Sequence, residues 1–186
     1  ATHSQDGWHA CGPECCFGAL TSGDIEMLEH SYPIIIHQYA LMEDSAGAGR
    51  FRGGSGTCWE VEPLDGPMTL ITFGEGRRIP AMGAGGAKSA MVEKKVGRLE
   101  LTRNGATEII TDNVIETINP GERAANKNPG GGGFGNPFER EVTSVVEDVR
   151  NGLVSLEGAR LDYGVVIADR QSLRVDTAAT DALRAS

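Results

Sequence analysis

The stretch HSQDGWHACGPECC, residues 3–16, gathers side chains whose types suit metal binding. Within fourteen residues it holds two histidines, one aspartate and three cysteines: His3, Asp6, His9, Cys11, Cys15 and Cys16. All of these side chains can ligate zinc. The Cys-x3-Cys-Cys spacing is not a standard ligand pair, and no second Cys/His pair follows it downstream. Two interpretations stay open: a zinc site built from these histidines and cysteines, and an irregular loop of packed thiols.

Nucleophilic chemistry is a further option for the same stretch. Cys15 or Cys16 beside His9 could act as an activated nucleophile, because a neighbouring base favours the thiolate. Catalytic triads are recognised from geometry and not from sequence order, so the sequence names no triad. His37 and Cys58 stand alone in segments that read as strands.

A glycine-rich loop, GAGRFRGGSG at residues 47–56, has the ingredients of an anion site. Glycines free backbone amides, and the guanidinium groups of Arg50 and Arg52 suit carboxylate or phosphate. No Gly-Lys-Ser/Thr follows, and no helical pattern follows, which excludes a Walker loop and a dinucleotide fingerprint. The alternative is that both arginines pair with the carboxylates of the preceding MEDS stretch.

Composition excludes several classes of protein. A net charge of −9 over 186 residues argues against a nucleic-acid partner. No apolar run approaches the roughly 18 to 20 residues of a membrane span. The N-terminus lacks a signal-peptide pattern, so we expect a cytoplasmic chain whose four cysteines are reduced. The first residue is not Met, which suggests a processed chain or a fragment of a longer protein.

Strand patterns dominate the first two thirds of the chain. A short helical turn is expected at 25–30, before a run rich in branched and aromatic residues at 32–42. The clearest local signal is GRLELTRNGATEIIT, 97–111, where Asn104-Gly105 predicts a type I′ hairpin turn. Further strands are predicted within 57–64, 67–75 and 113–122.

Helical patterns follow after residue 138. Residues 139–150 place four valines on one helical face, and Asn151-Gly152 marks its end. A second helix is expected at 155–164 between the N-cap Ser155 and Gly164, then a strand at VVIAD and a terminal helix. The fold class is α+β: a β-rich unit with glycine-rich loops and short C-terminal helices. We expect an irregular segment at 1–24, a β-rich region at 25–137 and a helical region at 138–186.

The loop NPGGGGFGNP, residues 128–137, lies between the predicted strands and the predicted helices. Four consecutive glycines would suit a flexible linker, but such linkers are usually longer and rich in serine. Phe134 inside the loop and Asn-Pro at both ends favour a fixed shape. Phosphate binding is the alternative, because PFER after the loop can open a helix whose N-terminus attracts anions.

Three stretches together resemble the hydantoinase B family, which includes 5-oxoprolinase and the acetone and acetophenone carboxylases. The run DIEMLEHSYPIIIHQYALMEDSAGAGRFRGGSG resembles the family pattern that ends in DSGGAGRFRGGxG. The run NPGGGGFGNPFEREVTSVVEDVRNGLVSLEGARLDYGVVI resembles PGGGGYGDPxxR followed by DVRxGLVSxExAxxxYGVV. FGEGRRIPAMGAGGA, between them, is similar to DRxxxPPxGxxGG. The match is ordered and extends from about Gly7 to Ile167.

The resemblance implies an ATP-driven reaction shared between subunits. A hydantoinase-A-type partner would bind ATP and Mg and phosphorylate an amide or enolate oxygen of a small-molecule substrate. The B-type subunit would then complete hydrolysis of a cyclic amide or carboxylation of a ketone. Such subunits are much longer, and the sequence resembles their C-terminal third. The resemblance therefore implies further hydantoinase-B-type sequence that carries a divalent metal, and little activity for this chain alone.

The family's Asp-Gly loop corresponds to Asp6-Gly7, and this suggests Asp6 and His9 as catalytic residues. Arg50 and Arg52 are the candidates for binding an acidic group. The chain departs from the family where WHACGPECCFGALTSG replaces an Asn/Thr-rich stretch, and where Ala46 replaces a glycine. Two alternatives to a catalytic part are a non-catalytic scaffold subunit and a small zinc-binding module.

Overall fold

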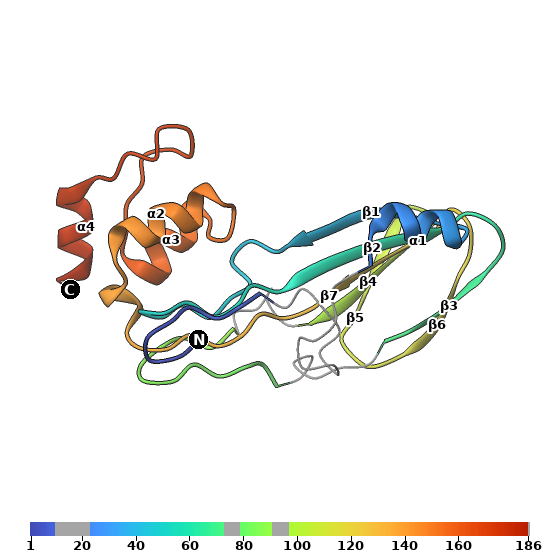
Figure 1. Cartoon of the computed structure of the whole chain (residues 1–186), viewed down its shortest axis with the longest axis horizontal. Helices are drawn as coiled ribbons and strands as arrows, with labels where there is room; N and C mark the ends of the chain where they lie inside the picture. The colour runs from blue at the N-terminus through green and yellow to red at the C-terminus, as the bar shows by residue number, and fades with distance from the viewer. Residues whose placement is uncertain (10–22, 73–78, 91–96, 186) are drawn as a thin grey trace.

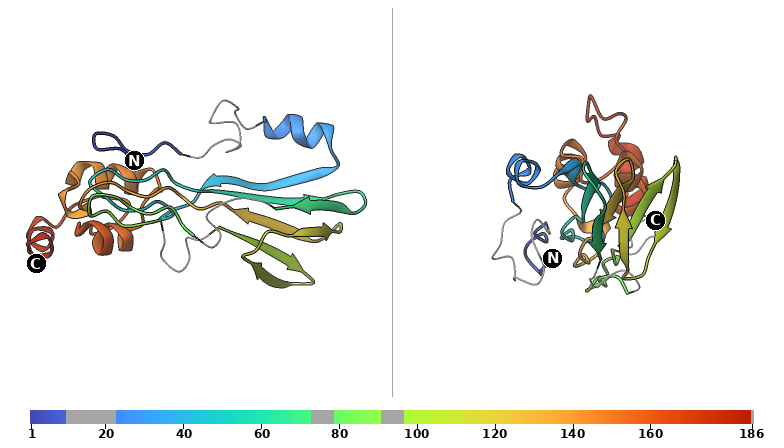
Figure 2. Two further views of the ribbon diagram at one scale, coloured as in Figure 1. Left: turned by 90° about the horizontal axis from the view of Figure 1, so that it is seen from below. Right: turned by 90° about the vertical axis from the view of Figure 1, so that its right-hand side faces the viewer.

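The computed structural model describes residues 1–9, 23–72, 79–90 and 97–185 (Figure 1). Figure 1 shows a sheet at one end of an elongated molecule, helices at the other end, and extended segments that join them. In both Figure 1 and the left view of Figure 2, the C-terminal helix lies at the end opposite the sheet. This combination of an antiparallel sheet and separate helices confirms the α+β class.

The sheet has five antiparallel strands in the order β1-β2-β7-β4-β5. Their bounds are β1 Ile34–Leu41, β2 Thr57–Pro63, β7 Arg123–Lys127, β4 Arg98–Arg103 and β5 Ala106–Ile110. Helix α1, Ile25–Ser31, precedes β1 and begins at Asp24, whose carboxylate accepts a hydrogen bond from the Met27 amide. The helical turn and the strand predicted at the start of this region are thus confirmed.

The β4–β5 hairpin turns at Asn104-Gly105, as predicted. Asn104 has φ of 51° and Gly105 has φ of 78°, the left-handed backbone that a type I′ turn needs at both central positions. The register pairs Arg103 with Ala106 directly beside the turn. The Asn-Gly pair therefore sets which residues of the two strands face each other.

The central strand β7 was missed by sequence reasoning. Its sequence, RAANK, has no β-branched or aromatic residue. It forms a strand because it pairs with β2 on one side and with β4 on the other, and because Ala124 and Ala125 are buried there. Such pairing overrides intrinsic strand propensity, which depends strongly on context.

A two-stranded ribbon packs against one face of the sheet. It joins β3, Met68–Ile71, to β6, Ile115–Ile118. The core between ribbon and sheet is made by fully buried Leu99, Leu101 and Ile118, with Met68 and Leu70 packed against them. This region is held together by ordinary burial of side chains.

The helices form a second core. Helix α2, Val142–Arg150, follows the short 3₁₀ helix η2, Pro137–Glu139, and buries Val145 and Val149. Helix α3, Leu156–Tyr163, has Ser155 as N-cap and ends at Gly164 with φ of 65°, as expected. Helix α4, Thr177–Arg184, confirms the predicted terminal helix.

The prediction of a strand at residues 165–169 is wrong. This segment makes one isolated bridge, between Ile167 and Val175, and forms no strand. Val165 and Ile167 are buried in the core of the helices. A short apolar run fits a buried strand or any other buried segment, and here it fills space between helices. Within the described part of the chain, no helix is long and apolar enough to cross a membrane.

Candidate functional site

The glycine-rich segments pack against one another as extended backbone. We call residues 45–56, 82–88 and 130–135 the glycine layers. The Gly47 amide donates to the Gly131 carbonyl at 2.9 Å, and the Ala84 amide donates to the Gly133 carbonyl at 3.0 Å. Phe51 and Phe134 exchange two backbone hydrogen bonds of 2.9 Å. The glycine run is therefore a shaped element with fixed partners on both sides.

Close backbone contact explains why glycine is needed in these layers. A Cβ atom on Gly53 would collide with the Gly131 carbonyl, and one on Gly132 would collide with the Met82 carbonyl. Real Cβ atoms cannot occupy such positions without movement of the backbone. The NPGGGGFGNP loop thus has the fixed shape that we expected.

Buried charges join the glycine layers to the helices and to the N-terminus. Arg140, whose side chain is 4% exposed, donates from Nη1 and Nη2 to the two carboxylate oxygens of Asp6 at 2.7 and 2.8 Å. The Arg140 Nη2 also donates to Asp148 Oδ2 of helix α2 at 2.8 Å. Arg52 Nε lies 3.2 Å from Asp148 Oδ1. We call Asp6, Arg52, Arg140 and Asp148 the ion-pair cluster.

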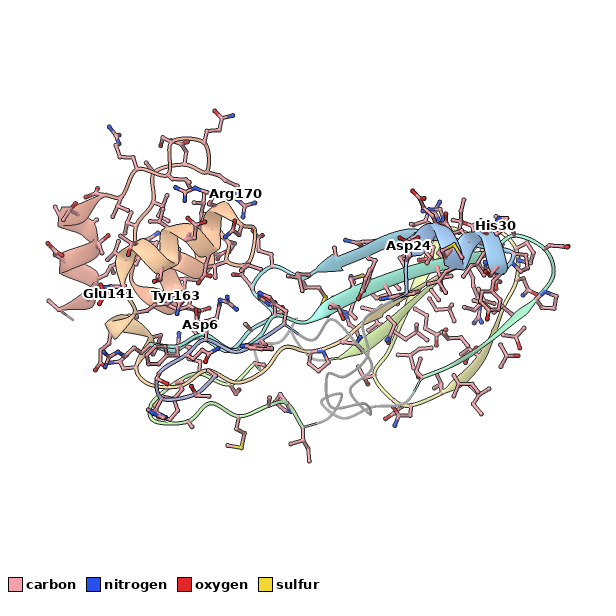
Figure 3. All side chains as sticks on the ribbon, in the orientation of Figure 1. Asp6, Asp24, His30, Glu141, Tyr163 and Arg170 are labelled. Carbon is pink, nitrogen blue, oxygen red and sulfur yellow. The ribbon has the colours of Figure 1, made fainter. Side chains whose placement is uncertain are left out.

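The pKa shifts follow from this arrangement. Burial alone would raise the pKa of Asp6, but the hydrogen bonds and charge of Arg140 and the Arg52 amide outweigh burial and lower that pKa. Burial alone would lower the pKa of Arg140, yet its bonds to Asp6 and the charge of Asp148 raise it. Both groups therefore stay charged. Figure 3 shows Asp6 below the helices near Tyr163, whose ring centre lies 6.0 Å from the Arg140 guanidinium carbon.

His9 lies beside the glycine layers at the end of the described N-terminal segment. Its Nδ1 atom accepts a hydrogen bond of 3.1 Å from the Ser55 amide. Burial and the nearby charge of Arg52 lower the pKa of His9, which favours the neutral ring. Because Nδ1 accepts, the proton of the neutral ring is on Nε2. His9 thus has a fixed tautomer, with its N–H donor on Nε2.

The two arginines of the loop have different environments. Arg50 is exposed, and its guanidinium carbon lies 5.7 Å from the Phe51 ring centre. Arg52 is 4% exposed and donates from Nη1 to the Gly53 carbonyl at 2.6 Å, besides its pairing with Asp148. The alternative that the MEDS carboxylates hold both arginines is wrong for Arg52. Those carboxylates bind elsewhere: Glu43 pairs with Arg170, and Asp44 accepts from the Ser155 amide.

Among the residues that the structure describes, the predicted zinc ligands do not form a site. His3 is exposed, and Nδ1 of His9 is occupied by the Ser55 amide. Cys11, Cys15 and Cys16 lie outside the described residues. Within the described ranges, no group of three or more His, Cys, Asp or Glu side chains could hold a metal ion. Those described residues do not fit zinc.

Sequence reasoning missed Arg140 and Asp148 as members of this site. Arg140 is the arginine of the PxxR ending, and Asp148 opens the DVR run. Both lie in the stretches that carry the family resemblance, so the signal was present. It could not be used because Asp6 and Arg140 are 134 residues apart, and spacing does not reveal such contacts.

Several known proteins are similar to this chain in sequence and structure. The chain is 57% identical over 187 residues to the beta subunit of caprolactamase from Pseudomonas jessenii, which covers 100% of this chain and 32% of that protein. The crystal structure of ATP-dependent caprolactamase from Pseudomonas jessenii superposes with a TM-score of 0.87 at 53% identity, over 100% of this chain and 32% of that one.

A carboxylase subunit is a more distant relative. The delta subunit of acetophenone carboxylase from Aromatoleum aromaticum is 27% identical over 215 residues, which cover 100% of this chain and 31% of that protein. This chain therefore spans about a third of the length of these relatives. The model of the hydantoinase B/oxoprolinase family matches residues 1–137. With its three glycine-rich segments and this match, the chain belongs to the hydantoinase B/oxoprolinase family.

Proposed function

We propose that this chain forms part of the subunit that opens a cyclic amide in an ATP-dependent enzyme. The observation that carries the proposal is the 57% identity, over the whole chain, to the beta subunit of caprolactamase. The carboxylase relative reaches 27% over the same chain. Ring opening of a lactam is therefore favoured over carboxylation of a ketone.

ATP activation answers a chemical difficulty of this reaction. An amide resists attack by water because its carbonyl carbon is a poor electrophile. Transfer of phosphate from ATP to the amide oxygen, on a hydantoinase-A-type partner that holds ATP and Mg, would make that carbon electrophilic. Water then adds to the carbon, its protons pass to the nitrogen, and the carbon–nitrogen bond breaks to leave an acyl phosphate. A second water hydrolyses the acyl phosphate to the carboxylate and inorganic phosphate. We assign these later steps to the B-type subunit, together with the divalent metal that its remaining two thirds would hold.

His9 is the residue that we assign to the chemistry within this chain. Addition of water builds negative charge on the oxygens at the attacked carbon, and a neutral imidazole that carries its proton on Nε2 can donate a hydrogen bond to one of them. The Ser55 amide holds the opposite nitrogen, so the ring presents Nε2 in a defined orientation. Asp6, whose two oxygens bind Arg140, is assigned to positioning. Arg50, being exposed, is assigned to binding a phosphate or an acidic group, and Arg52 to internal pairing.

A scaffold role is the second candidate, and one observation favours it. Three of the charged side chains around the glycine layers, Arg52, Arg140 and Asp148, are at most 8% exposed, and both arginines pair with Asp148. In that case the chain would hold the catalytic portion in place without touching the substrate. The substitution Arg50→Ala separates the two candidates, because Arg50 lies outside the ion-pair cluster. Loss of turnover in a folded complex supports the catalytic role, and unchanged turnover supports the scaffold.

The reaction class is tested with the complete subunit purified together with its partner. The complex is given ATP and either a lactam, a hydantoin, 5-oxoproline, or acetone with bicarbonate. We expect ring-opened product and ADP with a cyclic amide, and no activity from the isolated 186-residue chain. Carboxylation of the ketone without opening of any ring would contradict the proposal, as would turnover by the isolated chain.

The zinc module is tested by elemental analysis of the same complex. The measurement compares the wild type with the Cys15→Ser and Cys16→Ser variants. Zinc that is lost in both variants would support a site at the N-terminus, and equal zinc content in all three proteins would exclude these cysteines as ligands.

A further inference from the structure

Arg140 is the only member of the ion-pair cluster whose side chain contacts three separate segments of the described chain. Nη1 donates to Asp6 Oδ1 at 2.7 Å and to the Arg50 carbonyl at 3.1 Å. Nη2 donates to Asp6 Oδ2 and to Asp148 Oδ2, both at 2.8 Å. The planar fork of a guanidinium matches a carboxylate in this two-point geometry, which a lysine cannot reproduce. Arg140 thus connects the N-terminal segment, the glycine layers and helix α2 through its guanidinium group.

The segment that carries His9 makes few other side-chain contacts with the rest of the protein. Residues 6–9 have four described attachments to the body of the protein. Asp6 binds Arg140 and the Arg52 amide, the Gly7 amide donates to the Arg52 carbonyl at 2.7 Å, and His9 accepts from the Ser55 amide. Trp8, between these anchors, is 86% exposed. The Trp8 side chain therefore contributes little to the placement of this segment, which depends on the pairing of Asp6 and on close backbone contact with Gly53 and Gly54.

The placement of Asp6 determines the placement of His9. Asp6 and Gly7 pair with the backbone of Arg52, and His9 pairs with the backbone of Ser55, three residues further along the same glycine layer. Two extended segments that are hydrogen-bonded at one pair of residues keep the same register at the next pair. If Asp6 is released, the bond between His9 Nδ1 and the Ser55 amide loses its support.

We propose that Arg140 is a positioning residue that holds Asp6 and, through residues 6–9, fixes the orientation of His9. The inference rests on the proposed function for its effect on turnover, because His9 is the residue assigned to hydrogen-bond the oxygen that gains charge when water adds. It goes beyond that function by assigning a role to a residue of the glycine-run motif that lies 131 positions from His9. Arg140 itself touches no substrate in this account.

The substitution Arg140→Gln tests the proposal in the complete complex, with two readouts. Hydrogen exchange followed by mass spectrometry reports on the amides of residues 5–9, and steady-state kinetics report on kcat and KM. We expect exchange of the Gly7 amide, which donates to the Arg52 carbonyl, to rise at least about tenfold. We expect kcat to fall about 100-fold and KM to change less than about threefold, because a small misplacement of a reacting group has effects of this size. Arg140→Lys should show the same pattern, since it restores charge without the fork.

Two further variants keep the test decisive. Asp6→Asn keeps the Arg140–Asp148 pair while it removes one of the two carboxylates that face the arginines, and it should loosen the same amides. Arg150→Gln is the matched control, because Arg150 lies on α2 with a 56% exposed side chain that pairs with Glu147. It should change neither readout.

Looser exchange at residues 5–9 together with a lower kcat supports the proposal. It is overturned if the folded Arg140→Gln complex shows unchanged exchange there, or looser exchange with unchanged kcat. A wild-type complex that opens no cyclic amide would instead count against the proposed function, and the exchange readout would still decide whether Arg140 positions the segment.

Discussion

Two regions of this molecule are held together by different means. Between the sheet and the β3–β6 ribbon, large side chains fill the interior, and Leu99, Leu101 and Ile118 have no exposed surface. In the glycine layers, backbone lies directly on backbone, and the interior leaves no room for a Cβ at Gly53 or Gly132. The first region is stabilised by the hydrophobic effect, and the second by hydrogen bonds and buried ion pairs.

This difference matters for function. A backbone-packed region cannot adjust by moving side chains, so its edges hold attached groups in fixed positions. His9, Arg50 and the ion-pair cluster all lie along these edges, as the contacts with Arg52, Ser55 and Gly135 show. The sheet offers no comparable cluster of buried charges in the described residues. We therefore place the chemistry at the glycine layers.

The largest difference should appear when one arginine is removed from each region. Arg52→Ala should lower the free energy of unfolding by about 4 kcal/mol, because it leaves a buried carboxylate with one partner fewer. Arg123→Ala on β7 should change it by less than about 1 kcal/mol, since Arg123 is 48% exposed and pairs with Glu62 at the surface. Denaturant unfolding of both variants measures this, and equal losses would break the contrast.

Truncation of a core leucine should affect the sheet as it does ordinary cores. Leu101→Ala should lower the free energy of unfolding by about 3 kcal/mol, since it deletes buried methyl groups and leaves a cavity. Ile109→Ala on the adjacent strand is the control, because Ile109 is 62% exposed and should change stability by less than about 0.5 kcal/mol. Thermal unfolding curves can be compared directly, and a costly Ile109→Ala would mean that this face is covered.

Neighbouring glycines should respond differently to one added methyl group. Gly132→Ala should lower stability by about 2 kcal/mol, because its Cβ would meet the Met82 backbone. Gly131→Ala should be tolerated, since its nearest contact is the Gly54 amide nitrogen at 3.5 Å, an ordinary van der Waals distance. Unfolding midpoints of the two variants give the result. Equal unfolding midpoints for the two variants would show that the glycine layers move apart to admit side chains.

The smallest effect concerns pH. His9 has a lowered pKa in the folded chain, so the unfolded chain binds the proton more readily. Its contribution to stability is present above about pH 6.5 and is lost as the pH falls from there toward the folded pKa. We expect the wild type to lose more stability than His9→Asn between pH 7.5 and 5.5. Parallel pH profiles for the two proteins would contradict the described environment of His9.

Local signals in the sequence predicted much of this fold. Asn104-Gly105 fixed the hairpin, and Ser155 with Gly164 bounded helix α3, because turns and caps depend on neighbouring residues. Strand β7 could not be found in this way, since its pairing with β2 and β4 makes it a strand. The same limit applied to the site. Asp6 was named from a motif, but its partner Arg140 comes from a segment whose approach only the folded chain reveals.

The coupling between ATP use and ring opening tests the central claim most directly. In the complete complex, ADP and ring-opened product are measured together for the wild type and for His9→Gln. If this chain acts in the opening step, His9→Gln should form far less ring-opened product per ADP than the wild type, because activation on the partner continues while the hydrogen bond that stabilises the oxygen charge during water addition is lost. An unchanged ratio of product to ADP in a folded His9→Gln complex would contradict the account.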